Sequence, residues 1–515
     1  MSHMKDFDCV VVGAGNAGIV AALRLAYGGK KTLLIEQHNL PGGVASSFRR
    51  GRFEFDPSLH ELCDLGPEDS PGSIRRLFDK LGVKVDWIEI PECFRVISTW
   101  SEDGEPMDVT LPCGIKEFIE KTVEYVPDSR KSVEGFFELC EETLAGIEYT
   151  SRMGAKADPM EMAKRFPNFL KAGALSVTEV YDLLEMPSRA RDILNTYWSY
   201  YAIDADHCAF VHYIAMTYKY IDKKPYMPTH TAHEISTAIV ERFRELGGEF
   251  WTNCRAEEFL FDGDVCCGVR TNRGDIYCDQ VLANINPHIL YGKMVPKALV
   301  PEREKKLANA REFSGRAFVA YFGLSKTAEE LGIKDYTVFL CDTTDSVKTY
   351  EDMKTMDKNT FSIMVCQSVL NPKFAPEGGC ILSFTSMYGS DVWGDVEVED
   401  YVAAKNKIAA RMMNDMNEKM GVDIAPYVEE MCVASPWTMA RYTGNPEGCV
   451  YGYETKDWDA MMARMMMIGS DYPIKHLRPI GAAGPQGDGY SSTYIVGDMF
   501  AKIVLREMEK EGGAK

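Results

Sequence analysis

The chain has 515 residues, of which 45% are hydrophobic and 26% charged, and its formal net charge at pH 7 is −20. That length supplies two or three domains with sizeable cores. The acidic balance argues against a nucleic-acid partner, because such binding needs clustered Lys and Arg that displace phosphate counterions. It also argues against simple electrostatic attraction to an anionic membrane surface.

Fifteen cysteines are scattered along the chain without a CxxC pair, and the adjacent Cys266 and Cys267 lack the spacing of metal ligands. We therefore expect reduced thiols in a cytoplasmic protein and predict no metal site. No apolar stretch reaches the ~20 residues that a membrane span needs. The short apolar run at 9–12 leads directly into a glycine turn, so it does not have the form of a signal peptide.

The most informative stretch is 8–36, which predicts a strand, a glycine turn, a helix and a second strand in that order. The turn at 13–18 has the pattern Gly-x-Gly-x-x-Gly, which brings backbone and a helix N-terminus against the diphosphate of a dinucleotide. An acid ends the second strand, close to the ~20-residue spacing expected for a group that holds ribose hydroxyls. The predicted dinucleotide contacts are Gly13, Gly15, Asn16, Ala17, Gly18, Glu36 and Gln37.

A second glycine pair, Gly42 and Gly43, follows the second strand. A nicotinamide-binding domain has no need of it, whereas in flavoproteins such a pair brings the backbone against the ribose and diphosphate of FAD. A basic side chain nearby can pair with phosphate oxygens; Arg49 and Arg50 both have that position, and both also fit a solvated basic turn. We therefore predict FAD as the cofactor, with Ser47 and Arg49 among its ligands.

Two insertions interrupt the dinucleotide-binding pattern. The first, 71–224, has mostly helical periodicity, and the second, 303–433, mixes strands with helices. A terminal helix with apolar residues at helical spacing is expected to pack on the first domain. The expected helices are 115–125, 133–147, 177–201, 400–420 and 495–507, and the expected strands of the second insertion are 317–322, 361–366 and 380–386.

This order predicts an α/β fold in which a doubly wound Rossmann-type FAD-binding domain, with a βββ hairpin, carries an inserted mixed α+β substrate domain. The FAD-binding domain is discontinuous, because its pattern returns twice after the N-terminal unit. Its predicted parts are 5–70, 229–290 and 436–515, and the substrate-binding domain takes 71–228 and 291–435.

Further motifs resemble those of one flavoprotein family. They include a returning segment at 228–274, Asn-x-Asn-Pro at 284–287, Arg-Tyr-Thr at 441–443 and a glycine-rich tail at 481–497. With the N-terminal turn, they are similar to the FAD-containing phytoene desaturase, carotenoid isomerase and retinol saturase group, within the amine oxidase-like flavoproteins. The resemblance implies further FAD contacts from Ala256, Asn286, Gly481, Gly487, Asp488, Gly489 and Tyr490.

The sequence departs from that family at two places near the expected flavin. Gly481 is followed by Ala482 where an acid is usual, so either Asp488 takes that role or the contact is lost. The turn that usually reads Asp-x-Gly reads Asp-Pro-Ser at 56–58. The chemistry at that face of the flavin is therefore expected to differ from that of a standard desaturase.

The same resemblance places residues 55–61 near the flavin, where His60 and Glu61 are the clustered proton-transfer groups. Both are candidate catalytic residues, and a hydrogen-bonded structural histidine is the alternative. Aromatic residues are dense over 197–220; they either line a tunnel for a long apolar molecule or form a domain core. Tyr200, in this aromatic stretch, is the third candidate catalytic residue.

The resemblance implies a flavin-dependent reaction on C–C double bonds of a long apolar substrate: a polyene, a retinoid or an unsaturated fatty acid. Desaturation, saturation and isomerisation all fit, with hydride exchange at flavin N5 and a nearby acid or base for protons. A flavin amine oxidase and a flavin-binding scaffold without turnover are the alternatives.

The sequence leaves the partners of this reaction open. There is no second dinucleotide motif, so reducing equivalents come from an electron-transfer partner or a second substrate unless the reaction is redox-neutral. The methionine-rich run at 461–467 either edges a lipid entrance and gives peripheral membrane contact or packs in the core. The oligomeric state is not defined by the sequence.

Overall fold

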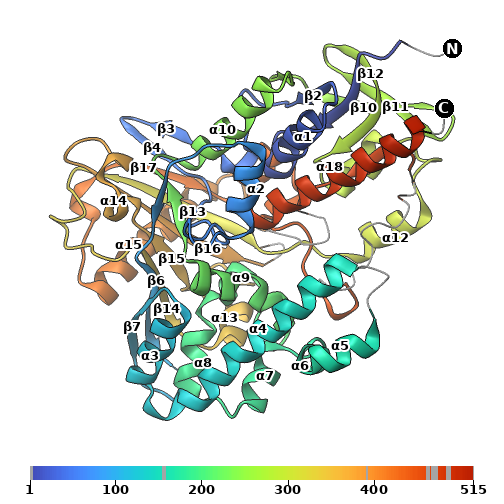
Figure 1. The fold of residues 1–515 in the computed structure, drawn as a ribbon. Helices are drawn as coiled ribbons and strands as arrows, with labels where there is room; N and C mark the ends of the chain where they lie inside the picture. The colour runs from blue at the N-terminus through green and yellow to red at the C-terminus, as the bar shows by residue number, and fades with distance from the viewer. Residues whose placement is uncertain are drawn as a thin grey trace.

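The computed structural model describes residues 4–101, 103–153, 158–389, 392–459, 464, 472, 474–482 and 489–513. Two large sheets organise this part of the chain, each with seven strands. Figure 1 shows them as neighbouring layers, with the N-terminal strand and the C-terminal helix on the same side of the molecule. The architecture is mixed α/β, as predicted, and the first sheet holds the glycine turn.

The first sheet combines parallel strands from three separate stretches of sequence with one antiparallel hairpin. Its parallel pairs are β1 with β2 and β12, β2 with β9, and β12 with β18. The strands are β1 (Phe7–Val12), β2 (Thr32–Ile35), β9 (Glu249–Trp251), β10 (Ala256–Asp262), β11 (Val265–Thr271), β12 (Gly274–Ala283) and β18 (Leu477–Pro479).

The register of this sheet defines its ligand-binding edge. Val12 at the end of β1 lies beside Ile35 of β2 and Ala283 of β12. β1 and β2 are buried and apolar apart from their polar ends, which suits strands covered on both faces. Because the carboxyl ends of these parallel strands meet, the segments that follow them converge at one edge, where doubly wound sheets bind ligands.

Three helices cover the first sheet. α1 (Asn16–Tyr27) packs against α10 (Ala232–Glu245) and α18 (Tyr490–Gly513). α18 approaches α1 closely because Gly497 has no side chain between it and the backbone of Ala17. The terminal helix expected at 495–507 is therefore present, and it extends beyond that range at both ends.

The second sheet has the strand order β17-β13-β16-β15-β14-β6-β7. The three strands expected in the second insertion are found, with slightly different ends, as β13, β15 and β16, and the helix expected at 400–420 is α15. The strands are β6 (Glu92–Trp100), β7 (Met107–Pro112), β13 (Arg316–Leu324), β14 (Thr337–Thr343), β15 (Ser362–Val365), β16 (Cys380–Tyr388) and β17 (Val428–Ala434).

The first insertion is mostly helical, as predicted, although it also contributes strands. β6 and β7 join the second sheet, and β5 (Trp87–Glu89) pairs with β8 (Tyr226–Pro228). One expectation for this insertion was wrong. The single helix expected at 177–201 is divided into α7 (Val177–Leu183), α8 (Ser188–Leu194) and a 3-10 turn, because Pro187 cannot continue a helix that precedes it.

The remaining elements are two short strands and the other helices. A short hairpin pairs β3 (Phe48–Arg50) with β4 (Phe53–Phe55). The helices are α2 (Ser73–Leu81), α3 (Ile115–Tyr125), α4 (Arg130–Met153), α5 (Pro159–Arg165), α6 (Pro167–Ala172), α9 (Phe210–Lys223), α11 (Pro287–Ile289), α12 (Glu302–Ala310), α13 (Ser346–Asp352), α14 (Gln367–Leu370), α15 (Tyr401–Met420) and α16 (Pro436–Thr443).

Candidate active site

A cavity of about 1230 Å³ joins the ligand-binding edge of the first sheet to the second sheet. Gly13 of the glycine turn and Ser492 of α18 line one part of it. Val319 of β13, Thr385 of β16 and Tyr220 of α9 line another. The space at the dinucleotide-binding edge is therefore continuous with a chamber walled by the second sheet.

The glycine turn presents backbone to this cavity. Gly13 has a φ of +92°, and a Cβ added to it would lie 2.7 Å from the backbone oxygen of Asn284. A Cβ on Gly15 would lie 2.9 Å from Asn284 Nδ2. Only glycine fits both places, so the first turn of α1 can approach a diphosphate with its free N–H groups.

Two polar side chains beside the turn are set for a nucleotide. Glu36 accepts hydrogen bonds from the backbone N–H of Ala14 (2.7 Å) and of His38 (2.9 Å), which fixes its carboxylate at the cavity wall. Asn16 Oδ1 is buried and has no hydrogen-bond partner in the described part of the chain. A buried acceptor without a donor is costly, so a bound hydroxyl or amide would be stabilising there.

Most of the predicted FAD contacts come together in this cavity, although they lie on separate stretches of the chain. Their approach to one another follows from the strand register, which brings the ends of β1, β2, β12 and β18 to one edge. The predicted residues that line the cavity are Gly13, Gly15, Asn16, Ala17, Glu36, Gln37, Gly42, Gly43, Ala256, Asn286, Gly481, Gly489 and Tyr490.

Three predicted contacts lie outside the cavity wall. Gly18 packs directly against the backbone oxygen of Gly13, the close helix–strand contact for which a glycine is needed. Ser47 donates a hydrogen bond to Glu54 (2.5 Å), and Arg49 forms an ion pair with the same carboxylate (3.0 Å). The side chain of Arg49 is 78% exposed, so its contact with a phosphate stays a prediction.

Some expectations fall on residues that the structure does not describe. Gly487 and Asp488 are among them, as is the methionine run at 461–467 apart from Arg464. Asn284, in contrast, was quoted only as part of a motif and proves central. Its amide lies against Gly13, Gly15 and Gly481, where a Cβ on the last would meet Asn284 Oδ1. Its position at the end of β12 was the available signal, because strand ends meet at the ligand edge.

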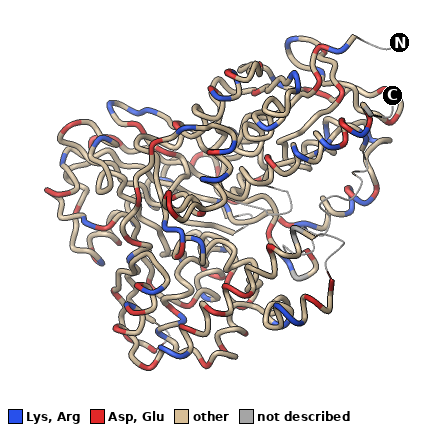
Figure 2. The backbone as a smooth tube through the Cα atoms, in the orientation of Figure 1, with Lys and Arg blue, Asp and Glu red and all other residues tan. Residues whose placement is uncertain are grey.

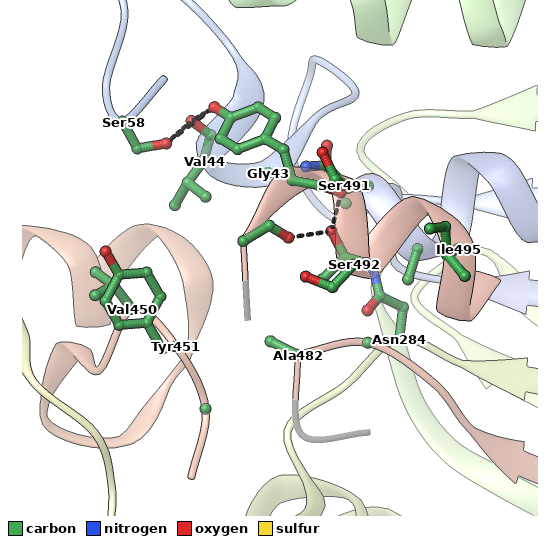
Figure 3. A pocket seen from close by; sticks show the side chains of 18 of the residues that line it. Gly43, Val44, Ser58, Asn284, Val450, Tyr451, Ala482, Ser491, Ser492 and Ile495 are labelled. Atoms are coloured by element: carbon green, nitrogen blue, oxygen red, sulfur yellow. Dashed lines mark hydrogen bonds between the residues drawn. The ribbon is translucent and has the colours of Figure 1, made fainter. Parts of the chain in front are cut away.

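The turn that departs from the family pattern ties three segments together. Ser58 Oγ donates to the backbone oxygen of Val44 (3.0 Å) and lies 3.0 Å from the hydroxyl of Tyr490. Figure 3 shows Ser58 beside Val44, with Tyr451 across the cavity and Asn284 and Ala482 below α18. The serine thus links the second glycine pair, the 56–58 turn and the start of α18.

His60 lies at the wall of the chamber and is held by the second sheet. Its Nε2 is 2.9 Å from the hydroxyl of Thr385, and its backbone oxygen accepts from Tyr336 (2.5 Å). Burial lowers the pKa of His60 to about 4, because an imidazolium there would lose its hydration. The ring is therefore neutral at neutral pH, and it forms one hydrogen bond with the hydroxyl of Thr385.

Glu61, the next residue, forms a buried pair with Tyr200. The hydroxyl of Tyr200 donates to Glu61 Oε1 (2.9 Å), and that of Thr337 donates to Oε2 (2.8 Å). Burial raises the pKa of Glu61 to about 7, although both hydrogen bonds act against the shift. Glu61, Tyr200 and His60 all line the cavity, so the three candidate catalytic residues share one wall.

Asp56 is a second buried carboxyl, but its role is structural. It accepts from the backbone N–H of Ala232 (2.8 Å) and from Gln367 Nε2 (2.7 Å). Burial raises its pKa to about 7. Asp56 does not line the cavity, whereas the adjacent Pro57 does; it anchors the start of α10 to the turn.

The aromatic stretch serves as both core and wall. Tyr197 is buried and stacks on Tyr220, with ring centroids 5.1 Å apart. Tyr220 in turn lines the cavity together with Tyr200, Tyr201 and Tyr218. The inner half of the cluster is thus domain core, and the outer half faces the chamber.

The family model of the NAD(P)-binding Rossmann-like domain matches residues 11–81, the stretch that holds the glycine turn. Solved structures show the fold of the whole chain. A putrescine oxidase variant has a TM-score of 0.63 at 14% identity, over 97% of this chain and 99% of that one. Cyclohexylamine oxidase from Brevibacterium oxydans has a TM-score of 0.60 at 14% identity, over 98% and 100%. Fold and glycine turn therefore define a Rossmann-like dinucleotide-binding protein with an amine oxidase-like architecture.

Curated relatives narrow this class. All-trans-retinol 13,14-reductase from Macaca fascicularis is 24% identical, over 92% of this chain and 81% of that protein. Chloroplastic prolycopene isomerase from Daucus carota is 20% identical over 88% and 72%. A 1-hydroxycarotenoid 3,4-desaturase from a Flavobacterium is 21% identical over 96% and 98%. They confirm the resemblance to the desaturase, isomerase and saturase group and the prediction of an enzyme of that kind, with a flavin as the indicated cofactor.

Membrane-crossing helices and metal-ligand groups are both missing from the described residues. No helix among them is long and apolar enough to cross a membrane. Nor do they contain a group of three or more His, Cys, Asp and Glu side chains that could hold a metal ion.

Proposed function

We propose that this protein is an FAD-dependent oxidoreductase or isomerase that acts on C–C double bonds of a long apolar molecule. The observation that carries the proposal is the single cavity, in which the dinucleotide edge and the wall of His60, Glu61 and Tyr200 share one space. The names of the relatives support the same class, since they describe a reductase, an isomerase and a desaturase of retinoid or carotenoid compounds.

The residues present fit FAD. A cavity of about 1230 Å³ exceeds the ~300–1,000 Å³ of ordinary ligand pockets, so a dinucleotide and part of a second molecule fit together. Gly13 and Gly15 would face the diphosphate, Glu36 the ribose, and Gly481 and Tyr490 the flavin end. The unpartnered Asn16 Oδ1 is a free acceptor within this region.

FAD would supply hydride exchange with a carbon atom through its N5. The chain's own contribution is proton transfer through buried side chains. The hydroxyl of Tyr200 donates to Glu61, and burial keeps that carboxyl protonated up to about pH 7. Tyr200 is the group that would pass a proton to or from a substrate carbon, with Glu61 as its reservoir. His60, neutral and bonded to Thr385, orients the neighbouring wall.

The first experiment is to denature the purified protein and identify the released small molecules by mass spectrometry and absorbance. Release of FAD with an apolar polyene or unsaturated lipid is the expected result. Release of NAD, or binding of no nucleotide even after FAD is supplied, would overturn the proposal.

The electron source and the amine oxidase alternative are tested on the same preparation. We propose that reducing equivalents come from a partner or a second substrate, because the sequence has no second dinucleotide motif. Slow reoxidation of the reduced flavin in air agrees with this. Rapid reoxidation with amine-dependent release of hydrogen peroxide would instead support a flavin amine oxidase.

A further inference from the structure

Ten Asp, Glu, Lys and Arg side chains on and around α2, α4, α9 and α18 line one part of the cavity. Figure 1 shows these helices around the centre of the molecule, and Figure 2 shows Lys and Arg along α2 and α18 in the same view. Six of the ten are cationic, in a chain with a net charge of −20. We call these six the cationic rim: Arg24, Arg76, Lys80, Lys219, Lys223 and Lys502.

The four acidic side chains in this part of the cavity, Asp64, Glu148, Asp222 and Asp498, do not neutralise the cationic rim. Asp64 pairs with Lys219 (2.6 Å), Asp222 with Lys223 (3.0 Å), and Asp498 with both Arg24 and Lys502.

The two rim cations on α2 have no such partner. Arg76 donates to the backbone oxygen of Pro71 (2.5 Å) and weakly to Ser73 Oγ (3.4 Å). Neither Arg76 nor Lys80 has a carboxylate partner among the described residues, and both are exposed residues that line the cavity. The rim therefore keeps an excess of positive charge beside the cavity.

Hydrogen-bond donors of the rim are also unused. Arg24 is only 4% exposed, and its Nη2 has no hydrogen-bond partner in the described part of the chain. An ammonium has three donors, and Lys219 gives one of them to Asp64. A buried charged donor without an acceptor is destabilising, so an anion in this part of the cavity would satisfy groups that the protein leaves unmatched.

Apolar side chains line the same cavity as the rim and the wall of His60, Glu61 and Tyr200, which we call the proton-transfer wall. They include Leu144 and Ile147 of α4 and Met216 of α9. His60 and Asp64 are four residues apart, so their backbones are separated by at most about 14 Å. A group held at Lys219 thus lies within the length of an aliphatic chain from the wall where His60 and Glu61 act.

We propose that the cationic rim binds the carboxylate of the substrate, so that the preferred substrate is an acid-terminated, unsaturated long-chain molecule with its double bond within the chain. This inference rests on the proposed function and selects among its substrate classes. A single carboxylate matches a rim whose charge is largely offset by its own acids, whereas a diphosphate would need more unpaired cations.

The test compares an unsaturated C18 fatty acid with the corresponding fatty alcohol on the flavin-loaded protein. Free probe is separated by ultrafiltration and quantified by mass spectrometry, so the readout does not depend on turnover. The acid is expected to bind about tenfold more tightly than the alcohol, and high salt is expected to reduce that preference. The variant R76Q/K80Q is expected to lose most of the preference while it binds the alcohol as before. The matched control is K84Q, because Lys84 is exposed and does not line the cavity.

Equal binding of acid and alcohol, or an unchanged acid preference in R76Q/K80Q, would overturn the inference and leave the proposed function standing. If neither probe binds to protein that holds its flavin, the apolar-substrate proposal fails as well. The two failures are therefore distinguished by the alcohol, which tests the chamber without testing the rim.

Discussion

The dinucleotide edge and the proton-transfer wall border the same cavity, yet they are built in different ways. At the edge, glycines and backbone groups make the surface, and Asn284 fills the space that side chains would otherwise occupy. At the wall, Glu61, Tyr200 and Thr337 come from three distant segments and are joined by side-chain hydrogen bonds. The edge is therefore sensitive to added volume, and the wall to the loss of a donor or acceptor.

The strongest test of this contrast adds one methyl group to the edge. Gly13→Ala is expected to abolish FAD retention, because the added Cβ would lie 2.7 Å from the backbone oxygen of Asn284 at a φ of +92°. The measurement is the flavin-to-protein ratio after purification. Gly29→Ala is the control, since Gly29 also has a positive φ but no heavy atom within 4 Å of an added Cβ; an equal loss of flavin there would show that backbone strain alone is responsible.

The matching test at the wall removes one oxygen without changing the volume. Tyr200→Phe is expected to keep its FAD and to slow the substrate-dependent flavin step by roughly 10²-fold, the lower end of general acid–base contributions. Stopped-flow absorbance of the flavin measures that step. Tyr197→Phe is the matched control, because Tyr197 donates to the backbone oxygen of Cys93 instead of a carboxylate; an identical slowing there would contradict the assigned role.

The pKa of Glu61 gives the wall a pH signature in stability. Its folded-state pKa of about 7 lies above the ordinary 4.5, so its contribution is present below about pH 4.5 and is lost as pH rises through 7. The change is on the order of 3 kcal/mol. Glu61→Gln is expected to flatten the decline of the urea unfolding midpoint between pH 4.5 and 7.5.

The control for that experiment is Glu54→Gln. The hydrogen bonds from Ser47 and Arg49 hold the pKa of Glu54 below its usual value despite partial burial, so its contribution is lost only as pH falls into the acid range. A flattened profile in Glu54→Gln, or an unchanged one in Glu61→Gln, would contradict the assignment of the titration to the wall.

The smallest effect is expected at the periphery of the edge. Arg49→Gln should leave the flavin content unchanged and alter stability by no more than about 0.5 kcal/mol, because Arg49 is mostly exposed and its ion pair with Glu54 is screened by solvent. A marked drop in bound FAD would restore Arg49 as a phosphate ligand and would show that the edge also depends on side chains.

The contrast between a backbone-built edge and a wall built from distant side chains explains how much of the site the sequence could predict. The glycine turn, Glu36 and the strand-end motif are local patterns, because their function depends on backbone geometry within a few residues, and these residues do line the cavity. The strands β6 and β7 were missed. β6 pairs with β14, about 240 residues away, and with β7, so the hairpin joins the sheet through a partner that local periodicity cannot indicate.

At the proton-transfer wall, the sequence predicted the candidate residues but not their hydrogen-bond partners. His60 and Glu61 were chosen because their residue types were right and a family likeness placed them near the flavin. Their partners Thr385 and Thr337 lie in strands of the second insertion, and a lone threonine in a strand has no distinguishing pattern. Ser47 and Arg49 stay predictions: basic and hydroxyl residues near a glycine pair suggest a phosphate, and in the structure both contact Glu54.

The late position of β18 and α18 in the sequence affects how the protein folds during translation. β18 completes the sheet beside β12, and α18 covers α1, yet more than 470 residues are synthesised before either element begins. At about 5–20 residues per second, α18 is synthesised roughly 25 to 95 s after the glycine turn. A nascent chain must therefore keep its first βαβ unit soluble without the cover that α18 provides, and FAD would be loaded only after translation is nearly finished.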